Sequence, residues 1–259
     1  MLLVLDVGNT NTVLGLYAAE ESGGEPRYGR LVAHWRVATV RSQTADEYGV
    51  LFRNLFAMKR MEARRVAGII ISSVVLRPHL APADAVTLSL AAGLAVQAAV
   101  KQVTGLEPDL RWPNDVLLKD KKFCGILTEM NAEATRVRYA VVGIGLNVNH
   151  ADLPGELRGR ATSLRLETGR AWSRVELAAA LLKSLDREYR SLDSTDPAAS
   201  DALLRRFEER SSYARGKQVR VEENGGFEGV TEGLDARGFL RVRTADGLRT
   251  VLSGGVRAL

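Results

Sequence analysis

The chain has 259 residues, of which 46% are hydrophobic and 26% charged, a composition typical of a globular protein with one large domain or two ordinary ones. The 36 Lys and Arg residues exceed the 31 Asp and Glu residues by five, which favours anionic partners, but no block of like charges predicts nucleic-acid binding. The single cysteine, Cys124, excludes an internal disulfide and a metal site built from cysteines of one chain, so we expect a reducing, cytoplasmic location.

The apolar opening, residues 1–5, stops at Asp6 and carries neither a basic leader nor a small-residue cleavage site, so it predicts a buried strand. No apolar stretch is expected to approach the roughly 20 residues that span a bilayer, so we predict no membrane partner.

The first part of the chain predicts mostly strands. Residues 1–5 and 13–17 are apolar and flank the polar turn 6–12, and residues 31–37 have the composition of a third strand. An amphipathic helix is expected after a capping-box spacing of Thr44 and Glu47, with its apolar positions at Tyr48, Leu51, Phe52 and Leu55. Residues 67–75 form a β-branched run that predicts one strand buried on both faces.

After residue 75 the composition changes, and a long helix is expected over residues 83–104, closed by Gly105. Four strands are predicted next, at residues 110–112, 116–118, 123–131 and 138–145, with 119–122 as a hairpin turn. A second capping-box spacing, Ser173 and Glu176, begins another helix, and residues 191–200 read as a linker before a helix over 201–210. From Gly216 on, period-two alternation between glycine turns predicts a small all-β module.

The first candidate site is the turn Asp6-Val7-Gly8-Asn9-Thr10-Asn11-Thr12. Gly8 lets backbone amides approach an anion, the Thr and Asn side chains can donate to phosphate oxygens, and Asp6 can hold Mg²⁺. A plain β-hairpin is the commoner explanation of such a turn.

Four segments nevertheless resemble, in order, the N-terminal part of the type III pantothenate kinases: DVGNTNTVLGLY, LVAHWRV, TADEYGVLFRNLF and IIISSVV. The resemblance covers about residues 1–75 and implies that Asp6, Gly8, Asn9, Thr10, Asn11 and Thr12 belong to a loop that receives ATP phosphates. The Gly-Ala-Asp-Arg stretch with the family's catalytic base and its Gly-Thr-Ala-Thr adenosine motif do not occur in this sequence, so the kinase reaction lacks its base.

The second candidate site combines RWPND (111–115), KFCGIL (122–127) and GIGLNVN (143–149). Lys122 can stabilise charge that develops on a carboxylate or phosphate, and Gly125 permits close approach of a ligand. Ile126 or Leu127 can form an apolar wall, and Asn147 can bind a purine or a phosphate. Each element alone also has a purely structural explanation.

Together with LSLAAGLAVQAAV before them and VLSGGVRAL at the end, these motifs resemble the biotin protein ligases. The resemblance implies ATP-dependent activation of biotin to biotinyl-adenylate and transfer to a lysine of a biotin carboxyl-carrier domain. It places Lys122 at the adenylate, Asn147 near the adenine, and a further set around the ligand: Trp112, Asn114, Asp115, Gly125, Ile126 and Leu127. Arg111 stands where the family often has Lys, which keeps the charge but changes the hydrogen bonding.

One departure concerns the family's Gly-Arg-Gly-Arg loop, which folds over biotin and has no match before Leu76. We therefore predict an α/β (α+β) fold, with a mixed sheet, flanking helices and a small C-terminal SH3-like β-barrel. The expected parts are a kinase-like fragment (1–75), a partial ligase catalytic domain (76–212) and the SH3-like domain (213–259). The predicted function is an impaired biotin ligase; the alternatives are a pantothenate kinase and an inactive chimaera, and a homodimer is possible. Cys124 is expected to be structural filler, and His34, His79 and His150 form no expected metal cluster.

Overall fold

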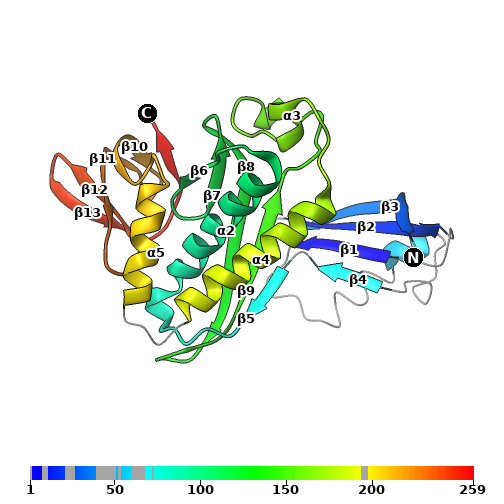
Figure 1. Ribbon diagram of the computed structural model, residues 1–259, viewed down its shortest axis with the longest axis horizontal. Helices are drawn as coiled ribbons and strands as arrows, with labels where there is room; N and C mark the ends of the chain where they lie inside the picture. Colours follow the sequence, from blue (N-terminus) through cyan, green and yellow to red (C-terminus); the bar gives the residue numbers. More distant parts are fainter. Residues whose placement is uncertain are drawn as a thin grey trace. The chain divides into compact units, whose positions relative to one another are not determined.

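The computed structural model of the chain describes residues 2–7, 11–20, 27–38, 51, 54–59, 68–71, 73–153, 155–193, 198–223 and 225–259. These residues form two compact units, 1–74 and 75–259, each of which is described by itself. Figure 1 shows their strands and helices.

The N-terminal unit is built on one four-stranded sheet. Its strands are β1 (Leu2–Val7), β2 (Asn11–Glu20), β3 (Arg27–Ala38) and β4 (Gly68–Ile71), in the order β3-β2-β1-β4. β2 pairs antiparallel with β1 and with β3, whereas β4 runs parallel to β1. The side chains of Leu14, Leu16 and Phe56 form its buried cluster, with Trp35 packed edge-on against Phe56. The three predicted strands over residues 1–37 are confirmed.

The predicted single strand over residues 67–75 is wrong. The run divides into β4 and β5 (Ser73–Leu76), which belong to different sheets, and Val75 is 56% exposed rather than buried on both faces. A β-branched run shows only that a segment is extended, because pairing partners come from elsewhere in the chain. Of the helix predicted from Thr44, Leu51 and residues 54–58 are helical, and the positions of its capping box lie outside the described residues.

The C-terminal unit contains a second sheet, covered on one face by helices (Figure 1). Its order is β5-β9-β8-β7-β6, with antiparallel pairs from β6 through β9. The bounds are β6 (Asp109–Arg111), β7 (Asp115–Leu118), β8 (Lys121–Ala132) and β9 (Val137–Leu146), which confirm the four predicted strands within a few residues.

The helix α2 (Val86–Thr104) forms the core of this unit. It follows a 3-10 turn, Pro82–Asp84, and ends at Gly105 in the left-handed conformation, as its sequence predicted. By length and composition residues 82–104 could cross a membrane, which corrects the expectation that no apolar stretch is long enough. Because 72% of its most apolar 18-residue stretch is buried inside the protein, the apolar length is that of a core helix.

The remaining helices are α3 (Leu164–Thr168), α4 (Arg174–Leu192) and α5 (Ala198–Glu209). Ser173 caps α4 by accepting a hydrogen bond from the Glu176 amide, as the capping-box spacing predicted. The predicted linker over 191–200 is shorter than expected, since α4 reaches Leu192 and α5 begins at Ala198; residues 194–197 lie outside the described part.

A third sheet ends the chain. Its order is β13-β12-β11-β10-β14, and the bounds are β10 (Arg215–Val221), β11 (Phe227–Leu234), β12 (Leu240–Thr244), β13 (Gly247–Val251) and β14 (Val256–Ala258). The predicted mixed α/β fold and all-β module are confirmed. In the part described, β13 and β14 stand at opposite ends of the order, so closure into a barrel is not seen.

Candidate active site

The hairpin that presents Lys122 has a two-residue turn. Leu118 pairs with Lys121, and the two residues between them, Lys119 and Asp120, both have positive φ (49° and 62°). This is the backbone of a type I′ turn, which suits Asn and Gly better than Lys and Asp. The turn is therefore narrower than the predicted 119–122, and Lys122 is the second residue of β8 rather than a tip residue.

This turn gives a stability prediction. Replacing Asp120 by glycine is expected to raise the free energy of unfolding by about 0.5–1 kcal/mol, because glycine adopts positive φ without strain. Urea unfolding followed by tryptophan fluorescence measures the change. Thr244→Gly, in the strand β12, is the matched control and should destabilise. Because Asp120→Ala loses the same contact with the Tyr213 hydroxyl, an Asp120→Gly protein that is less stable than Asp120→Ala would contradict the turn assignment.

A row of residues crosses four strands of the second sheet. Arg111 of β6 pairs with Asp115 of β7, Asp115 with Gly125 of β8, and Gly125 with Gly145 of β9. Residues paired directly across strands lie on the same face of a sheet. The alternate residues Leu110 and Ile126 lie beside Gly93 of α2, so the row occupies the face opposite that helix.

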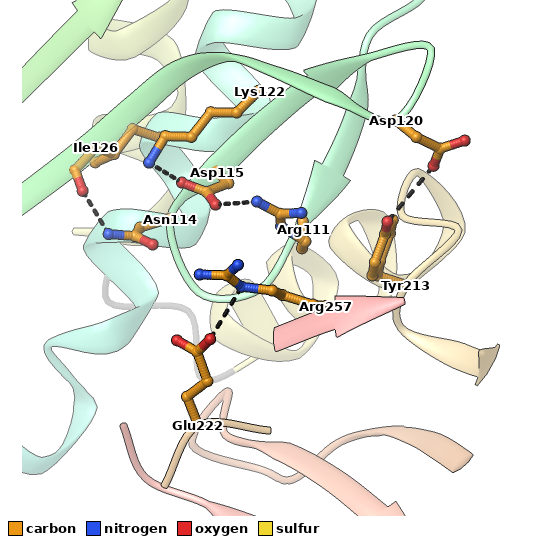
Figure 2. Close-up of polar contacts among 9 residues, drawn as sticks. All are labelled: Arg111, Asn114, Asp115, Asp120, Lys122, Ile126, Tyr213, Glu222 and Arg257. Carbon is orange, nitrogen blue, oxygen red and sulfur yellow. Dashed lines mark hydrogen bonds and ion pairs between the residues drawn. The ribbon is translucent and has the colours of Figure 1, made fainter. Parts of the chain in front are cut away.

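Asp115 connects two cations in this row, as Figure 2 shows. Its Oδ2 accepts a hydrogen bond from Arg111 Nη2 at 2.7 Å, and its Oδ1 contacts Lys122 Nζ in an ion pair without an aligned hydrogen bond. The side chain of Lys122 is 42% exposed and lies across Gly125, where a Cβ would be 2.9 Å from Lys122 Cε. Gly125 therefore makes room for the lysine side chain itself.

Other predicted residues line an apolar cavity of about 340 Å³, whose wall contains none of the row residues. Trp112, Asn114, Ile126 and Leu127 contribute to its wall, together with the start of α2 and residues of the third sheet. Asn114 and Ile126 exchange two hydrogen bonds of 2.8 Å, one of them from the Asn114 side chain to the Ile126 carbonyl. Trp112 is 2% exposed, and its Nε1 donates to the Gly238 carbonyl at 2.9 Å.

Asn147 follows the end of β9 and is held by backbone groups. Its amide N–H donates to the Phe123 carbonyl at 2.8 Å, and its Nδ2 donates to the Thr162 carbonyl at 3.1 Å. The predicted site residues of the second unit therefore divide into a charged row, a cavity wall and this amide.

The structure adds a residue that the motifs did not single out. Arg257 of β14 pairs with Glu222 Oε1 at 3.0 Å, and Figure 2 shows its guanidinium projecting from β14 toward the network. Its only sequence signal was its place in the terminal segment VLSGGVRAL.

Cys124 is buried, and this burial raises the pKa of its thiol well above the usual range, while Lys122 acts in the opposite direction. A neutral, enclosed thiol is consistent with structural filler and not with a nucleophile.

Glu167 fixes the hairpin from the side. Its carboxylate is 7% exposed, lies 2.9 Å from Lys119 Nζ and accepts a 2.7 Å hydrogen bond from the Thr162 hydroxyl. Burial opposes ionisation, but the Lys119 and Thr162 hydrogen bonds outweigh it and lower the pKa of Glu167 below its usual 4.5.

A lowered folded-state pKa contributes stability that is present above the unfolded value and is lost as the pH falls through the folded value. We expect Glu167→Gln to be less stable than the parent at neutral pH and to lose less stability below pH 4.5. Urea midpoints between neutral and acidic pH test this, with the exposed Glu176→Gln as control. Parallel pH curves for Glu167→Gln and the parent would refute it.

The predicted phosphate loop of the first unit is not placed. Gly8, Asn9 and Thr10 lie outside the described residues, and so do the side chains of Asp6, Asn11 and Thr12. Within the described ranges no group of three His, Cys, Asp or Glu side chains could hold a metal ion.

Comparison with known proteins connects both parts to families. The Type III pantothenate kinase family profile matches residues 2–116, and the profile of the Biotin protein ligase C terminal domain matches residues 215–256. The bifunctional ligase/repressor BirA of Bacillus subtilis is 34% identical over 189 residues, 71% of this chain and 56% of BirA. The type III pantothenate kinase of Koribacter versatilis is 67% identical over 76 residues, 29% of this chain and 28% of the kinase.

The solved structures point to one fold. Apo biotin protein ligase from Aquifex aeolicus has a TM-score of 0.63 and 29% identity, over 72% of this chain and 81% of that one. The same ligase in complex with biotin and ATP has a TM-score of 0.60 and 28% identity, over 73% and 79%. Most of the chain thus has the fold of the biotin protein ligases. More particularly, it is similar to these ligases over about residues 76–259 and to type III pantothenate kinases over about 1–75. It spans about half the length of the curated ligase and about a quarter of the curated kinase.

Proposed function

We propose that this chain is a biotin protein ligase-like enzyme that activates biotin with ATP to biotinyl-adenylate and transfers biotin to a lysine of a biotin carboxyl-carrier domain. The observation that carries the proposal is the row in which Arg111 and Asp115 pair beside the glycines of β8 and β9 and Lys122 lies across Gly125. The proposal includes a catalytic domain over 76–212, an SH3-like domain over 213–259 and a cytoplasmic location, with a homodimer as an open possibility.

The row can place positive charge next to the phosphate of an acyl adenylate. Lys122 can pair with the phosphate that links the two halves of the adenylate, because its contact with Asp115 is partly exposed and lacks an aligned hydrogen bond. Arg111 stays on Asp115 and keeps that carboxylate neutralised when Lys122 turns to the ligand. Gly145 leaves the strand backbone open to a flat group, whereas Gly125 is covered by the Lys122 side chain.

The neighbouring groups suit the remaining parts of the ligands. The cavity beside Trp112 and Leu127 is mostly apolar, which suits the thioether ring and the hydrocarbon chain of biotin. The side-chain nitrogen of Asn147 is engaged by Thr162, which leaves its Oδ1 to accept from the adenine amino group. We expect Mg²⁺ to bind together with the phosphates of ATP. The Asp115 carboxylate already pairs with two cations, Arg111 and Lys122.

Turnover is expected to be impaired. The Gly-Arg-Gly-Arg loop that closes over biotin in the family has no counterpart before Leu76. Lys122 is 42% exposed, and water that is not excluded weakens its electrostatic contact with the adenylate.

The test is incubation with ATP, biotin and a purified carrier domain, with biotinyl-adenylate and carrier mass both followed by mass spectrometry. Slow formation of adenylate supports the proposal. Absence of both adenylate and biotinylated carrier, together with no binding of a biotinyl-adenylate analogue in isothermal titration, would exclude it.

The alternatives have distinct signatures. A pantothenate kinase would release ADP in a coupled assay with pantothenate, and we expect no signal above background because the sequence lacks the family's base motif. An inactive chimaera would bind the biotinyl-adenylate analogue saturably without any turnover.

A further inference from the structure

Tyr213, in the segment between α5 and β10, is buried beside the charged row. Its ring lies 5.7 Å from the Arg111 guanidinium carbon and 4.9 Å from Lys217 Nζ, measured from the ring centroid. Its hydroxyl lies 3.5 Å from Asp120 Oδ1 at the hairpin turn, and Figure 2 shows the residue next to Arg111. One aromatic ring thus borders both the arginine of the row and the hairpin that carries Lys122.

The ring is fixed in place by the strand that holds Arg111. The Tyr213 amide donates to Ser211 Oγ at 3.2 Å, and this hydroxyl donates to the Leu110 carbonyl of β6 at 2.6 Å. The Ser212 amide donates to Asp109 Oδ1, also on β6, at 2.9 Å. Because Tyr213 is only 2% exposed, its ring presents a rigid surface to Arg111.

Arg111 can use that surface because its guanidinium is planar. Such a group contacts an aromatic ring and donates to a carboxylate at the same time, which an ammonium cannot do with comparable geometry. Asp115 is shared between Arg111 and Lys122, so the share of its charge that acts on Lys122 depends on where Arg111 is held. Four other carboxylates lie near the network: Glu222 pairs with Arg257, Glu167 with Lys119, Asp109 accepts from Ser212, and Asp120 lies at the Tyr213 hydroxyl.

We propose that Tyr213 is a positioning residue whose ring holds Arg111 against Asp115 and thereby sets how much of the Asp115 carboxylate is left to contact the Lys122 ammonium. The importance of Lys122 for catalysis rests on the proposed function above. The coupling itself needs neither ATP nor biotin and is measured without them.

The experiment measures the rate of acetylation of Lys122 by acetic anhydride as a function of pH, quantified by peptide mass spectrometry. In Tyr213→Leu, Arg111 loses its support and more of the Asp115 charge acts on Lys122. We expect the midpoint of the profile to move upward by roughly 0.5–1 pH unit. Burial raises the pKa of the Tyr213 phenol above its usual range. Arg111→Met should give at least the same shift.

The double variant tests whether Tyr213 acts on Lys122 through Arg111. If Tyr213 acts through Arg111, Tyr213→Leu combined with Arg111→Met shifts the midpoint no further than Arg111→Met alone. Tyr213→Phe keeps the ring but loses a hydroxyl that also interacts with Arg111, so it should shift the profile less than Tyr213→Leu. Lys217→Met, which removes the other cation on the same ring, is the matched control and should leave the profile unchanged.

An unshifted profile for Tyr213→Leu, or additive shifts in the double variant, overturns the proposal. If Tyr213→Leu does not fold, the proposal is tested by NMR on the parent protein. An Arg111 side chain held against the ring has proton resonances shifted upfield by the ring current. Random-coil chemical shifts for these protons would overturn the proposal. Shifted acetylation profiles without any adenylate formation would contradict the ligase function and leave the positioning role standing.

Discussion

Replacing Lys122 by methionine is expected to weaken binding of a non-hydrolysable biotinyl-adenylate analogue and to lower the rate of adenylate formation by roughly 100-fold. Methionine has a similar length and lacks the charge, so the change removes the ammonium that faces Asp115 and leaves Gly125 covered. Isothermal titration measures the binding even when turnover is slow. Stability should change little, since an ion pair of this exposure is worth about 1 kcal/mol or less.

The neighbouring lysine supplies the control. Lys121 lies on the same strand, but its Nζ is 4.0 Å from Glu167 and belongs to the other network. Lys121→Met should therefore retain binding of the analogue. Equal affinities of Lys122→Met and the parent protein would remove Lys122 from the site and, with it, the main support for the ligase function.

Replacing Trp112 by alanine is expected to cost about 3–5 kcal/mol of the free energy of unfolding of the second unit. The side chain is buried, forms part of the cavity wall and joins the strand end to Gly238 of the third sheet by a 2.9 Å hydrogen bond. Trp112→Phe keeps most of the volume and loses that bond, for which we expect about 1–2 kcal/mol. Urea unfolding followed by circular dichroism measures both.

Trp172→Phe is the matched control, because it removes a 2.9 Å indole hydrogen bond to Thr168 at a partly exposed position. We expect it to cost less than Trp112→Phe. If Trp112→Ala is as stable as Trp172→Phe, the junction between the second and third sheets does not depend on this residue, and the cavity is more adaptable than the structure indicates.

The sequence predicts local structure correctly where interactions between residues close in the chain decide it. The capping box at Ser173 and the glycine that ends α2 act through hydrogen bonds within a few residues, so their spacing was sufficient. The strands of the row were predicted for the same reason, as alternation and turn residues mark them. The motif residues from Arg111 to Asn147 could be singled out, although their roles remain proposals.

Partners that are distant in the chain were not predictable in the same way. The composition of residues 67–75 predicts one strand, because it contains no information that β4 pairs with β1 while β5 joins another sheet. The apolar length of α2 has the same ambiguity, because core burial and membrane crossing require similar compositions.

The sequence by itself determined most of the helices and strands and which short motifs carry charge and glycine. Only the tertiary structure decided that Arg111, Asp115 and Gly125 share one face, that Lys122 lies across that face, and that Tyr213 borders it. Strand register and packing between distant segments depend on the free energy of the whole unit, and no local pattern contains that information.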